Sequence, residues 1–390
     1  MRNIPLLMLS QAVLMTGTSL LVATSGLVGR ELADRALLAT VPLGLQFLAM
    51  TLTAMPASLL MQRIGRSRGF VLGAVLAMAG SGVAAWSILH GHFVGFCIGS
   101  MLLGSFNGFG QFYRFAAAET VTAGYRSRAI SWVLVGGIVA GFLGPNLAAW
   151  TRELLPALFA GSYAVLGVMY LIPLVAAAAM RIPVPSAAER AQRGRPLRTI
   201  AAQPNFLLAV AAATVGYGTM NLLMAATPLA MDSHGYGFGE TAFVIQWHVL
   251  AMFVPSFFTG HLIGRFGVYA ILAIGALLAL AAVAINLAGQ GTWDFWTALV
   301  CLGVSWNFLF IGGTTLLVET YEPAERAKCQ GVNDAVVFGT VTVTALGAGA
   351  LFDGIGWFWM NLAAALPMTL VLLGIAALRL RAGRAGVVTP

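Results

Sequence analysis

Long apolar stretches follow one another along almost the whole of this chain, and they limit what it can fold into. Crossing about 30 Å of hydrocarbon takes a helix of roughly 20 apolar residues. Stretches of about that length lie at 5–28, 37–61, 69–90, 93–118, 129–150, 157–180, 204–231, 239–263, 268–288, 295–318, 329–351 and 356–379. The sequence therefore predicts an all-α polytopic membrane protein with twelve transmembrane helices.

The scarcity of charged residues excludes a water-soluble globular fold. Asp, Glu, Lys and Arg make up 9% of the 390 residues, whereas a soluble domain carries about 25%. The net charge of +8 does not indicate a nucleic-acid partner, because the arginines lie between apolar stretches instead of forming a basic aqueous face. The three cysteines, Cys97, Cys301 and Cys329, have no CxxC spacing, so they indicate neither a disulfide framework nor a zinc site.

Basic residues are distributed unevenly between alternate loops. With the N-terminus in the cytoplasm, Arg30, Arg35 and Arg152 lie on the far side and Arg114 lies within a span. The cytoplasmic side then holds Arg2, Arg63, Arg66, Arg68, Arg126, Arg128, Arg181, Arg190, Arg193, Arg195, Arg198, Arg265, Arg326, Lys328, Arg379, Arg381 and Arg384. This bias predicts that both termini are cytoplasmic.

The second half of the sequence repeats features of the first half, about 200 residues later. The matching motifs are Glu119-Thr120 with Glu319-Thr320, Arg126 and Arg128 with Arg326 and Lys328, and Arg63-Ile64-Gly65 with Arg265-Phe266-Gly267. Between the halves, residues 181–202 form the longest polar stretch and are rich in Arg and Pro. We therefore predict two six-helix bundles, 1–180 and 203–390, joined by a cytoplasmic linker at 181–202.

Two parallel six-helix halves are also the plan of major facilitator transporters. The loop MQRIGRSRG at 61–69 resembles the GxLaDrxGRr signature of that superfamily. Gln62 replaces the usual acidic residue of the signature, and Gly264 replaces it in the second half. The resemblance covers the whole chain and implies the major facilitator superfamily fold.

Charged groups at membrane depth are candidates for function, since burying them unpaired in hydrocarbon is costly. Arg114 and Glu119 lie near the cytoplasmic end of the fourth span, and Asp334 lies early in the eleventh. We interpret them as a cytoplasmic gating or packing network, with proton coupling as the alternative. No acidic residue lies in the middle of spans one, seven, eight or ten, which argues against a multidrug cation–proton antiporter.

A methionine and histidine pattern on the seventh and eighth spans predicts a metal site. His248 precedes Met252 by four residues, and Met220 precedes Met224 by four, so each pair shares a helix face. Counted from the turn near Gly235, the two pairs lie at matched depth. Thioethers are soft ligands that select Cu(I). The alternative is that these side chains only fill gaps in the core.

Two further pairs have weaker signals. Cys97 and Met101 form another sulfur pair four residues apart, which we interpret as packing, with auxiliary metal ligation as the alternative. His90 and His92 flank a predicted periplasmic turn, where they either collect copper or belong to a solvated turn.

At these residues the resemblance becomes more specific. The stretches MNLLMAATPLAM at 220–231 and IQWHVLAMFVPSFFTG at 245–260 resemble the CcoA-type copper importers of the major facilitator superfamily, which carry MxxxM on helix seven and HxxxM on helix eight. The resemblance implies copper import across a bacterial inner membrane by alternating access, for assembly of a cbb3-type cytochrome oxidase. It also implies Met220, Met224, His248 and Met252 as ligands, a monomer without a cofactor, and a cytoplasmic copper chaperone as a partner.

Related RfnT-type proteins are linked to riboflavin uptake, so import of riboflavin or another small organic solute stays open as the alternative. A flavin site needs stacking aromatic rings and amide-type hydrogen-bond partners. The sequence offers Gln46, Asn107, Gln111, Tyr113, Asn221, Trp247, Trp306 and Asn307. No acid–base pair, metal triad or activated nucleophile is apparent, so an enzyme is not predicted.

Overall fold

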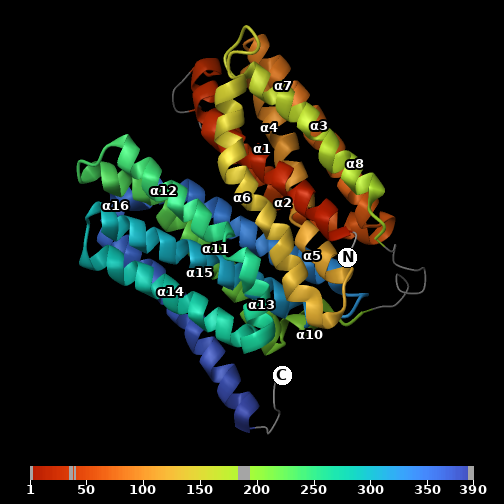
Figure 1. Ribbon diagram of the computed structural model, residues 1–390, viewed down its shortest axis with the longest axis vertical. Helices are drawn as coiled ribbons and strands as arrows, with labels where there is room; N and C mark the ends of the chain where they lie inside the picture. The colour runs from red at the N-terminus through yellow and green to blue at the C-terminus, as the bar shows by residue number, and fades with distance from the viewer. Residues whose placement is uncertain (1–2, 35–37, 39–40, 183–193, 385–390) are drawn as a thin grey trace. The chain divides into compact units, whose positions relative to one another are not determined.

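The computed structural model describes residues 3–34, 38, 41–182 and 194–384, and the regular structure within these ranges is helical (Figure 1). The helices of the first half are α1 (Asn3–Leu32), α2 (Val41–Ile64), α3 (Arg66–Leu89), α4 (Phe93–Gly110), α5 (Tyr113–Glu119), the 3₁₀ turn η2 (Ala123–Tyr125), α6 (Arg126–Thr151), α7 (Ala160–Met169) and α8 (Leu171–Ala179). Those of the second half are α10 (Leu197–Ala201), α11 (Pro204–Ser233), α12 (Phe238–Phe253), α13 (Ser256–Phe266), α14 (Val268–Ala288), α15 (Thr292–Val318) and α16 (Arg326–Arg384).

The described helices bear out the predicted polytopic architecture. Ten helical stretches are long and apolar enough to cross a membrane, and α12 with α13 make an eleventh if that bent pair is one span. Helix α16 counts once among the ten, although Gly356 inside it has a non-helical backbone with φ 77°. Dividing α16 at Gly356 separates the two spans that the sequence predicts at 329–351 and 356–379.

Three predicted spans are interrupted in the structure, among them the span predicted at 157–180, which divides into α7 and α8 at Tyr170. The span predicted at 239–263 divides into α12 and α13, whose axes differ by 44°. Pro255 lies in the break, where its missing N–H removes a helical hydrogen bond. The span predicted at 93–118 divides into α4 and α5 between Gly110 and Tyr113.

The chain forms two compact units, and each takes a short segment from the other half of the sequence. Unit 1 comprises Met1–Val121, Trp132–Gly194 and Pro323–Phe338, and unit 2 comprises Thr122–Ser131, Arg195–Glu322 and Gly339–Pro390. Residues 183–193 of the predicted linker lie outside the described residues, as do Arg2, Arg35, Arg190 and Arg193 of the topology prediction and positions 37, 39 and 40 of the second predicted span.

Unit 1 is held together by close helix crossings at small residues. Helix α4 packs against both α2 and α3. A Cβ on Gly80 would lie 2.9 Å from the backbone oxygen of Gly99, and a Cβ on Gly99 would lie 2.8 Å from that of Gly80. Glycine therefore lets the α3 and α4 backbones touch. In lipid there is no hydrophobic driving force between helices, so close packing at small residues of this kind drives their association.

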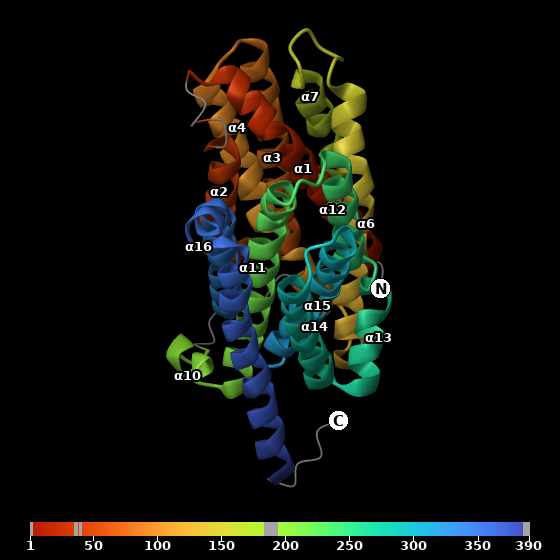
Figure 2. The ribbon, with the colours of Figure 1, turned by 90° about the vertical axis from the view of Figure 1, so that its left-hand side faces the viewer.

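Helix α15 lies at the centre of unit 2, where α11, α12 and α14 pack against it (Figures 1 and 2). A Cβ on Gly303 would lie 2.8 Å from the backbone oxygen of His248, so α12 and α15 also cross at a small residue. This contact brings the His248 turn of α12 directly onto α15.

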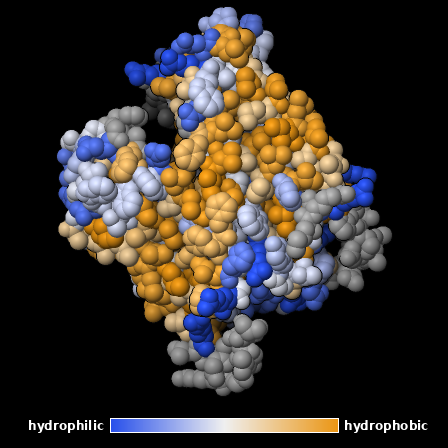
Figure 3. Space-filling view, in the orientation of Figure 1, coloured by the Kyte–Doolittle hydropathy of each residue, from blue (hydrophilic) through white to orange (hydrophobic). Residues whose placement is uncertain are grey.

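The exposed sides of the helices are apolar, as a lipid environment requires. On the face shown in Figure 3, hydrophobic side chains cover the flanks of the helices in each unit and hydrophilic ones gather near helix ends. Leu52, Val175 and Leu366 are each more than 60% exposed. Exposed apolar surface of this extent indicates contact with lipid.

The repeated Arg-x-Gly motif has the same backbone geometry in both units. Gly65 has φ 92° and ψ 156°, and Gly267 has φ 81° and ψ 154°; each precedes the first residue of a helix. This combination of angles is essentially restricted to glycine. The sequence repeat thus corresponds to a repeated turn, between α2 and α3 in unit 1 and between α13 and α14 in unit 2.

Candidate functional site

A cluster of charged and amide groups lies in unit 1 where the first turn of α16 meets α3 and α5. The Arg66 guanidinium donates to Glu119 Oε1 at 2.7 Å and to Oε2 at 3.3 Å. Arg66 also donates to the Gln330 side-chain oxygen, while the Gln330 amide donates to Glu119 at 3.1 Å. Arg326 donates to Glu119 Oε2 at 3.4 Å. Glu119 therefore joins one cation from each half of the sequence.

A second, deeper ion pair joins α5 to α16 within the same unit. Arg114 donates to Asp334 Oδ1, and the two side chains are 2% and 0% exposed. Arg114 also donates to the Gln111 carbonyl at 2.8 Å, and its guanidinium lies 4.5 Å from the centre of the Phe115 ring. Of the three charged residues singled out from the sequence, Arg114 thus pairs with Asp334, whereas Glu119 belongs to the Arg66 cluster.

Neutral hydrogen bonds tie the same segment of α16 to α2. Ser58 donates to the Ala327 carbonyl at 2.8 Å, and the Gln62 amide donates to the Ala324 carbonyl at 3.3 Å. Gln62 stands where the superfamily signature has an acid, and an acid could not donate this bond unless it were protonated. The residue at the signature position therefore contacts this segment as a hydrogen-bond donor.

A reciprocal arrangement is found in unit 2. Ser127 donates to the Gly260 carbonyl at 3.0 Å, and a Cβ on Gly260 would lie 2.6 Å from the Cα of Arg128. Partial desolvation raises the pKa of the Glu319 carboxyl, and the nearby charge of Arg126 acts against that rise. The first turn of α6 therefore packs in unit 2, as the first turns of α16 pack in unit 1.

The four predicted copper ligands lie on α11 and α12. Met220 and Met252 are buried, His248 is fully buried, and Met224 is partly exposed. His248 Nδ1 donates to the Leu299 carbonyl of α15 at 2.7 Å. Among the described residues its Nε2 has no hydrogen-bond partner.

The backbone of Met252 belongs to a polar network between α12, α13 and α15. The Asn307 amide donates to the Met252 carbonyl and to Ser256 Oγ, both at 2.7 Å, and Thr259 donates to Asn307 Oδ1 at 2.7 Å. These bonds satisfy carbonyls and hydroxyls at the break before α13. Asn307, one of the candidate solute-binding amides, is therefore committed to joining helices.

The weaker candidates have local contacts. Cys97 is buried, whereas Met101 is 39% exposed. His90 Nδ1 donates to the Trp86 carbonyl at 2.8 Å, and its ring stacks on that of Trp86. His92 Nδ1 accepts from the Gly95 N–H at 3.0 Å, which caps the start of α4.

Four aromatic rings from α11, α12 and α15 cluster in unit 2. Trp306 stacks on Phe310 with 15° between the ring planes, and the Tyr217 and Phe253 rings approach Trp306 edge-on at 5.3 and 5.5 Å between centroids. Trp306 is 3% exposed, and its indole N–H has no hydrogen-bond partner among the described residues. Sequence reasoning selected Trp306 but not its three neighbours, because their spacing on separate helices carries no signal.

The other candidates for binding an organic solute are distributed over both units. Gln46 is buried and its side-chain oxygen lacks a partner among the described residues, whereas Gln111 accepts from Arg114 at 3.2 Å. Asn221 joins α11 to α16 through the Val341 carbonyl at 3.2 Å. Trp247 is 43% exposed and belongs to a second aromatic group with Phe243, Trp293 and Trp296. Tyr113 and Asn107 are buried in unit 1.

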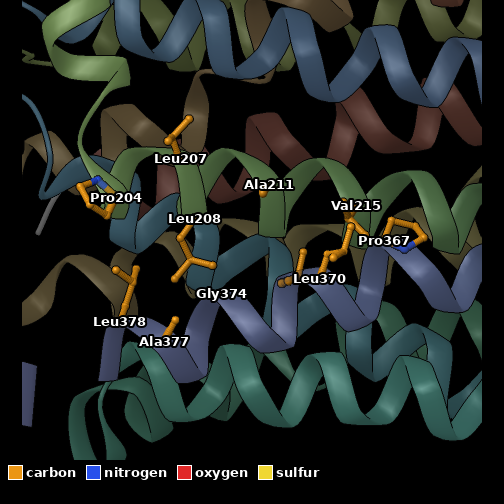
Figure 4. A pocket seen from close by; sticks show the side chains of 11 residues that line it. Pro204, Leu207, Leu208, Ala211, Val215, Pro367, Leu370, Gly374, Ala377 and Leu378 are labelled. Atoms are coloured by element: carbon orange, nitrogen blue, oxygen red, sulfur yellow. The ribbon is translucent and has the colours of Figure 1, made fainter. Parts of the chain in front are cut away.

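A groove of about 490 Å³ lies between α11 and the last part of α16 in unit 2 (Figure 4). Its lining consists of Pro204, Leu207, Leu208, Ala211, Val215, Pro367, Leu370, Val371, Gly374, Ala377 and Leu378. Such a lining offers no side-chain hydrogen bond, so this groove lacks the polar groups that orient a polar solute.

Comparison with known proteins identifies the family. Residues 7–311 match the Major Facilitator Superfamily. The chain is 41% identical over 365 residues to the riboflavin transporter RfnT of Brucella anthropi, covering 92% of this chain and 91% of that protein. No comparison shows the copper-importer group specifically, so that resemblance stays a prediction.

Solved structures agree in fold. The human organic anion transporter MFSD10 superimposes with a TM-score of 0.78 at 12% identity, covering 96% of this chain and 99% of that one. A bacterial homologue of the iron transporter ferroportin gives 0.76 at 11% identity, covering 97% and 99%. With all-helical architecture, a matching family and the same fold, this chain belongs to the Major Facilitator Superfamily and is a membrane transporter, not an enzyme.

Proposed function

We propose that this transporter imports riboflavin across the bacterial cytoplasmic membrane. The observation that carries the proposal is the 41% identity to the riboflavin transporter RfnT, which extends over nearly the full length of both chains. An alignment of this extent includes the helices that line the substrate path as well as those that face lipid. Riboflavin was the alternative to copper in the sequence analysis, and it is now the leading candidate.

The aromatic cluster of unit 2 supports a flavin as substrate. The isoalloxazine ring is planar, with an apolar face and a polar edge, so it binds best to stacked aromatic rings with a few fixed hydrogen-bonding groups. Trp306 and Phe310 provide parallel rings, and the Trp306 N–H is a buried donor without a partner. Such an unsatisfied donor is costly unless a ligand uses it.

Import of a flavin fits the predicted topology, with both termini in the cytoplasm and six-helix bundles at 1–180 and 203–390. We propose that the chain works as a monomer.

Alternating access requires contacts that form in one state and break in another. We propose that the Arg66–Glu119–Gln330–Arg326 cluster and the Arg114–Asp334 pair are such contacts. Both tie the segment Pro323–Phe338, which belongs to the second half of the sequence, into unit 1. Their release would free this segment during the transport cycle.

Copper is the second candidate, and His248 is the observation in its favour. Because Nδ1 donates to Leu299, Nε2 carries the free lone pair, as it does in metal-binding histidines that donate to a carbonyl. Nε2 is also buried without a partner among the described residues. Copper would pass through as substrate, bound by His248 with the thioethers of Met220, Met224 and Met252.

Growth of a riboflavin-auxotrophic bacterium that lacks its own uptake system tests the proposal. Expression of this chain should restore growth at micromolar riboflavin, and the Trp306→Leu variant, which removes a stacking ring and its free N–H, should require more riboflavin. A strain that expresses the protein in its membrane and still needs millimolar riboflavin would contradict riboflavin import.

A further inference from the structure

The apolar groove of unit 2 runs along α11 and the last part of α16 (Figure 4). Pro204 and Leu378 lie at one end of it, and Val215 and Pro367 lie at the other. With a rise of about 1.5 Å per residue, α11 extends ~17 Å between Pro204 and Val215, close to half of the ~30 Å hydrocarbon layer of a bilayer. The groove therefore has the depth of one leaflet, which is the space that one lipid acyl chain fills.

Small and buried side chains form the floor of the groove. Leu208 and Val371 are buried, and Gly374 has no side chain; a Cβ there would lie 3.7 Å from Leu208 Cδ1. Leu207 and Leu370 also line the groove and are both more than half exposed, so its opening faces the surrounding lipid. In lipid, apolar side chains gain nothing by association alone, but a groove of this kind holds a hydrocarbon chain through van der Waals contacts.

The corresponding spans of unit 1 are joined at their ends by side-chain hydrogen bonds. Helix α1, the first span of that half, packs against α8 in its last span. The Asn3 amide donates to the Arg181 carbonyl at 3.0 Å, and the Arg181 N–H donates to Asn3 Oδ1 at 3.2 Å. The repeat, about 200 residues long, places Pro204 at the position of Asn3. Proline has no polar side chain to make this bridge, so the bridge of unit 1 has no equivalent at the Pro204 end of the groove.

Arginines are concentrated at the Pro204 end of the groove. Arg198 precedes Pro204 by six residues, and Arg379 directly follows Leu378. Both arginine side chains are exposed, and among the described residues neither forms an ion pair. The flanking stretches 194–206 and 366–384 contain no Asp or Glu and carry Arg195, Arg198, Arg379, Arg381 and Arg384. The predicted topology places this end in the cytoplasm, where basic residues next to a span attract anionic lipid headgroups.

We propose that this groove binds an anionic phospholipid of the cytoplasmic leaflet. One acyl chain lies between α11 and α16, and Arg198 and Arg379 hold the headgroup phosphate through charge-assisted hydrogen bonds. A zwitterionic phospholipid offers the same chains, but its ammonium group cancels much of the attraction to the two arginines. Binding of this lipid is independent of the transported solute, whether riboflavin or copper.

Native mass spectrometry of the purified full chain measures the lipid preference. The probes are dioleoyl phosphatidylglycerol, which is anionic, and dioleoyl phosphatidylethanolamine, which is zwitterionic and has the same chains. One phosphatidylglycerol should bind per chain about 25-fold more tightly, because each arginine near an anionic lipid contributes about fivefold to the affinity. Equal affinity of the parent protein for the two lipids would overturn the proposal.

Substitution of the two arginines tests where the headgroup binds. Arg198→Gln combined with Arg379→Gln should remove the preference for phosphatidylglycerol, whereas Arg198→Lys combined with Arg379→Lys keeps the charges and should keep the preference. Arg265→Gln changes another exposed arginine of unit 2, in the last turn of α13, and should bind phosphatidylglycerol like the parent. A full preference in the double Gln variant, or its loss in Arg265→Gln, would overturn the assignment of the headgroup to Arg198 and Arg379.

Variants that fill the groove test where the acyl chain lies. Gly374→Leu fills it from α16, and Ala211→Phe fills it from α11. Phosphatidylglycerol should raise the melting temperature of the parent, as a ligand of the native state does, and should not raise that of either filled variant. Ala376→Leu, at an exposed position of α16 outside the groove, should respond like the parent. A rise equal to that of the parent in both filled variants would overturn the proposal, as would a protein dimer in place of the lipid complex.

Discussion

Glu119 accepts a hydrogen bond from Arg326 at 3.4 Å, and the two residues belong to opposite members of the sequence repeat. The counterpart of Glu119 is Glu319, and its carboxyl lies within the electrostatic reach of Arg126, the counterpart of Arg326. Each acid of the repeat therefore has the basic residue of the other repeat as its neighbour, one set in unit 1 and one in unit 2. The two copies of the motif thus pair crosswise: the acid of each copy lies near the basic residue of the other copy.

Glu119 and Arg326 should contribute unequally to stability. Glu119→Ala leaves Arg66 buried without a carboxylate, which costs about 3–5 kcal/mol for a buried pair. Arg326→Ala should cost less than about 1 kcal/mol, because Arg326 is more exposed and its bond is longer. Thermal unfolding of the purified protein in detergent measures both. Equal falls in melting temperature for the two variants would show that the Arg66–Glu119 ion pair is not the main stabilising contact of the cluster.

The paired turn glycines should be intolerant of a side chain. Gly65→Ala and Gly267→Ala each force a positive φ on alanine, which costs about 1–3 kcal/mol. Gly264→Ala is the control, because Gly264 lies inside α13 with open space at its Cβ, and alanine is favoured there by about 0.5–1 kcal/mol. Melting temperatures should therefore fall for the first two variants and rise slightly for the third. A fall for all three variants would point to a cause other than the backbone angle.

Trp306 should matter for affinity if its ring stacks on a flavin. Trp306→Leu removes the ring and the free N–H. Loss of one stacking contact costs about 1–3 kcal/mol, so the half-saturating riboflavin concentration should rise roughly tenfold. Trp306→Phe keeps a ring and should have a smaller effect. Trp293→Leu, at a 69% exposed position on the same helix, is the matched control. Concentration-dependent riboflavin uptake compares them; a wild-type profile for Trp306→Leu would remove Trp306 from the site.

His248 separates the two candidate substrates. In the riboflavin account, its main contact is the hydrogen bond from Nδ1 to Leu299, so His248→Leu should cost about 0.5–1.5 kcal/mol of stability and leave riboflavin uptake largely intact. In the copper account, the same change removes a ligand and abolishes copper uptake. Uptake of riboflavin and of copper by His248→Leu, measured at equal expression, distinguishes the two accounts. Loss of copper uptake alone would favour copper as the substrate.

Much of the architecture was predictable from the sequence because lipid imposes simple rules. Apolar length predicted the spans, and the Arg-x-Gly motif was part of the predicted internal repeat; the structure has equivalent turns at its two copies, Gly65 and Gly267. The break at Pro255 and the division between α4 and α5 were not predicted, since apolar length alone does not register a local change of helix direction.

The candidate site was less accessible to sequence reasoning. Arg114 and Asp334 stood out because charges are rare in spans, but their pairing across 220 positions left no local pattern. Arg66 was interpreted as a topology signal and as part of the signature loop, and its burial and its bonds to Glu119 and Gln330 were not predicted. The aromatic ring cluster around Trp306 depends on three helices packing together, which spacing along one helix cannot reveal.

The most direct test of riboflavin import is uptake by the purified protein in liposomes, with labelled riboflavin and radioactive copper supplied in parallel. The account predicts riboflavin uptake above that of protein-free liposomes, competition by unlabelled riboflavin, and copper uptake no greater than in the protein-free control. Copper uptake that depends on the protein and on His248, with no riboflavin uptake, would contradict it.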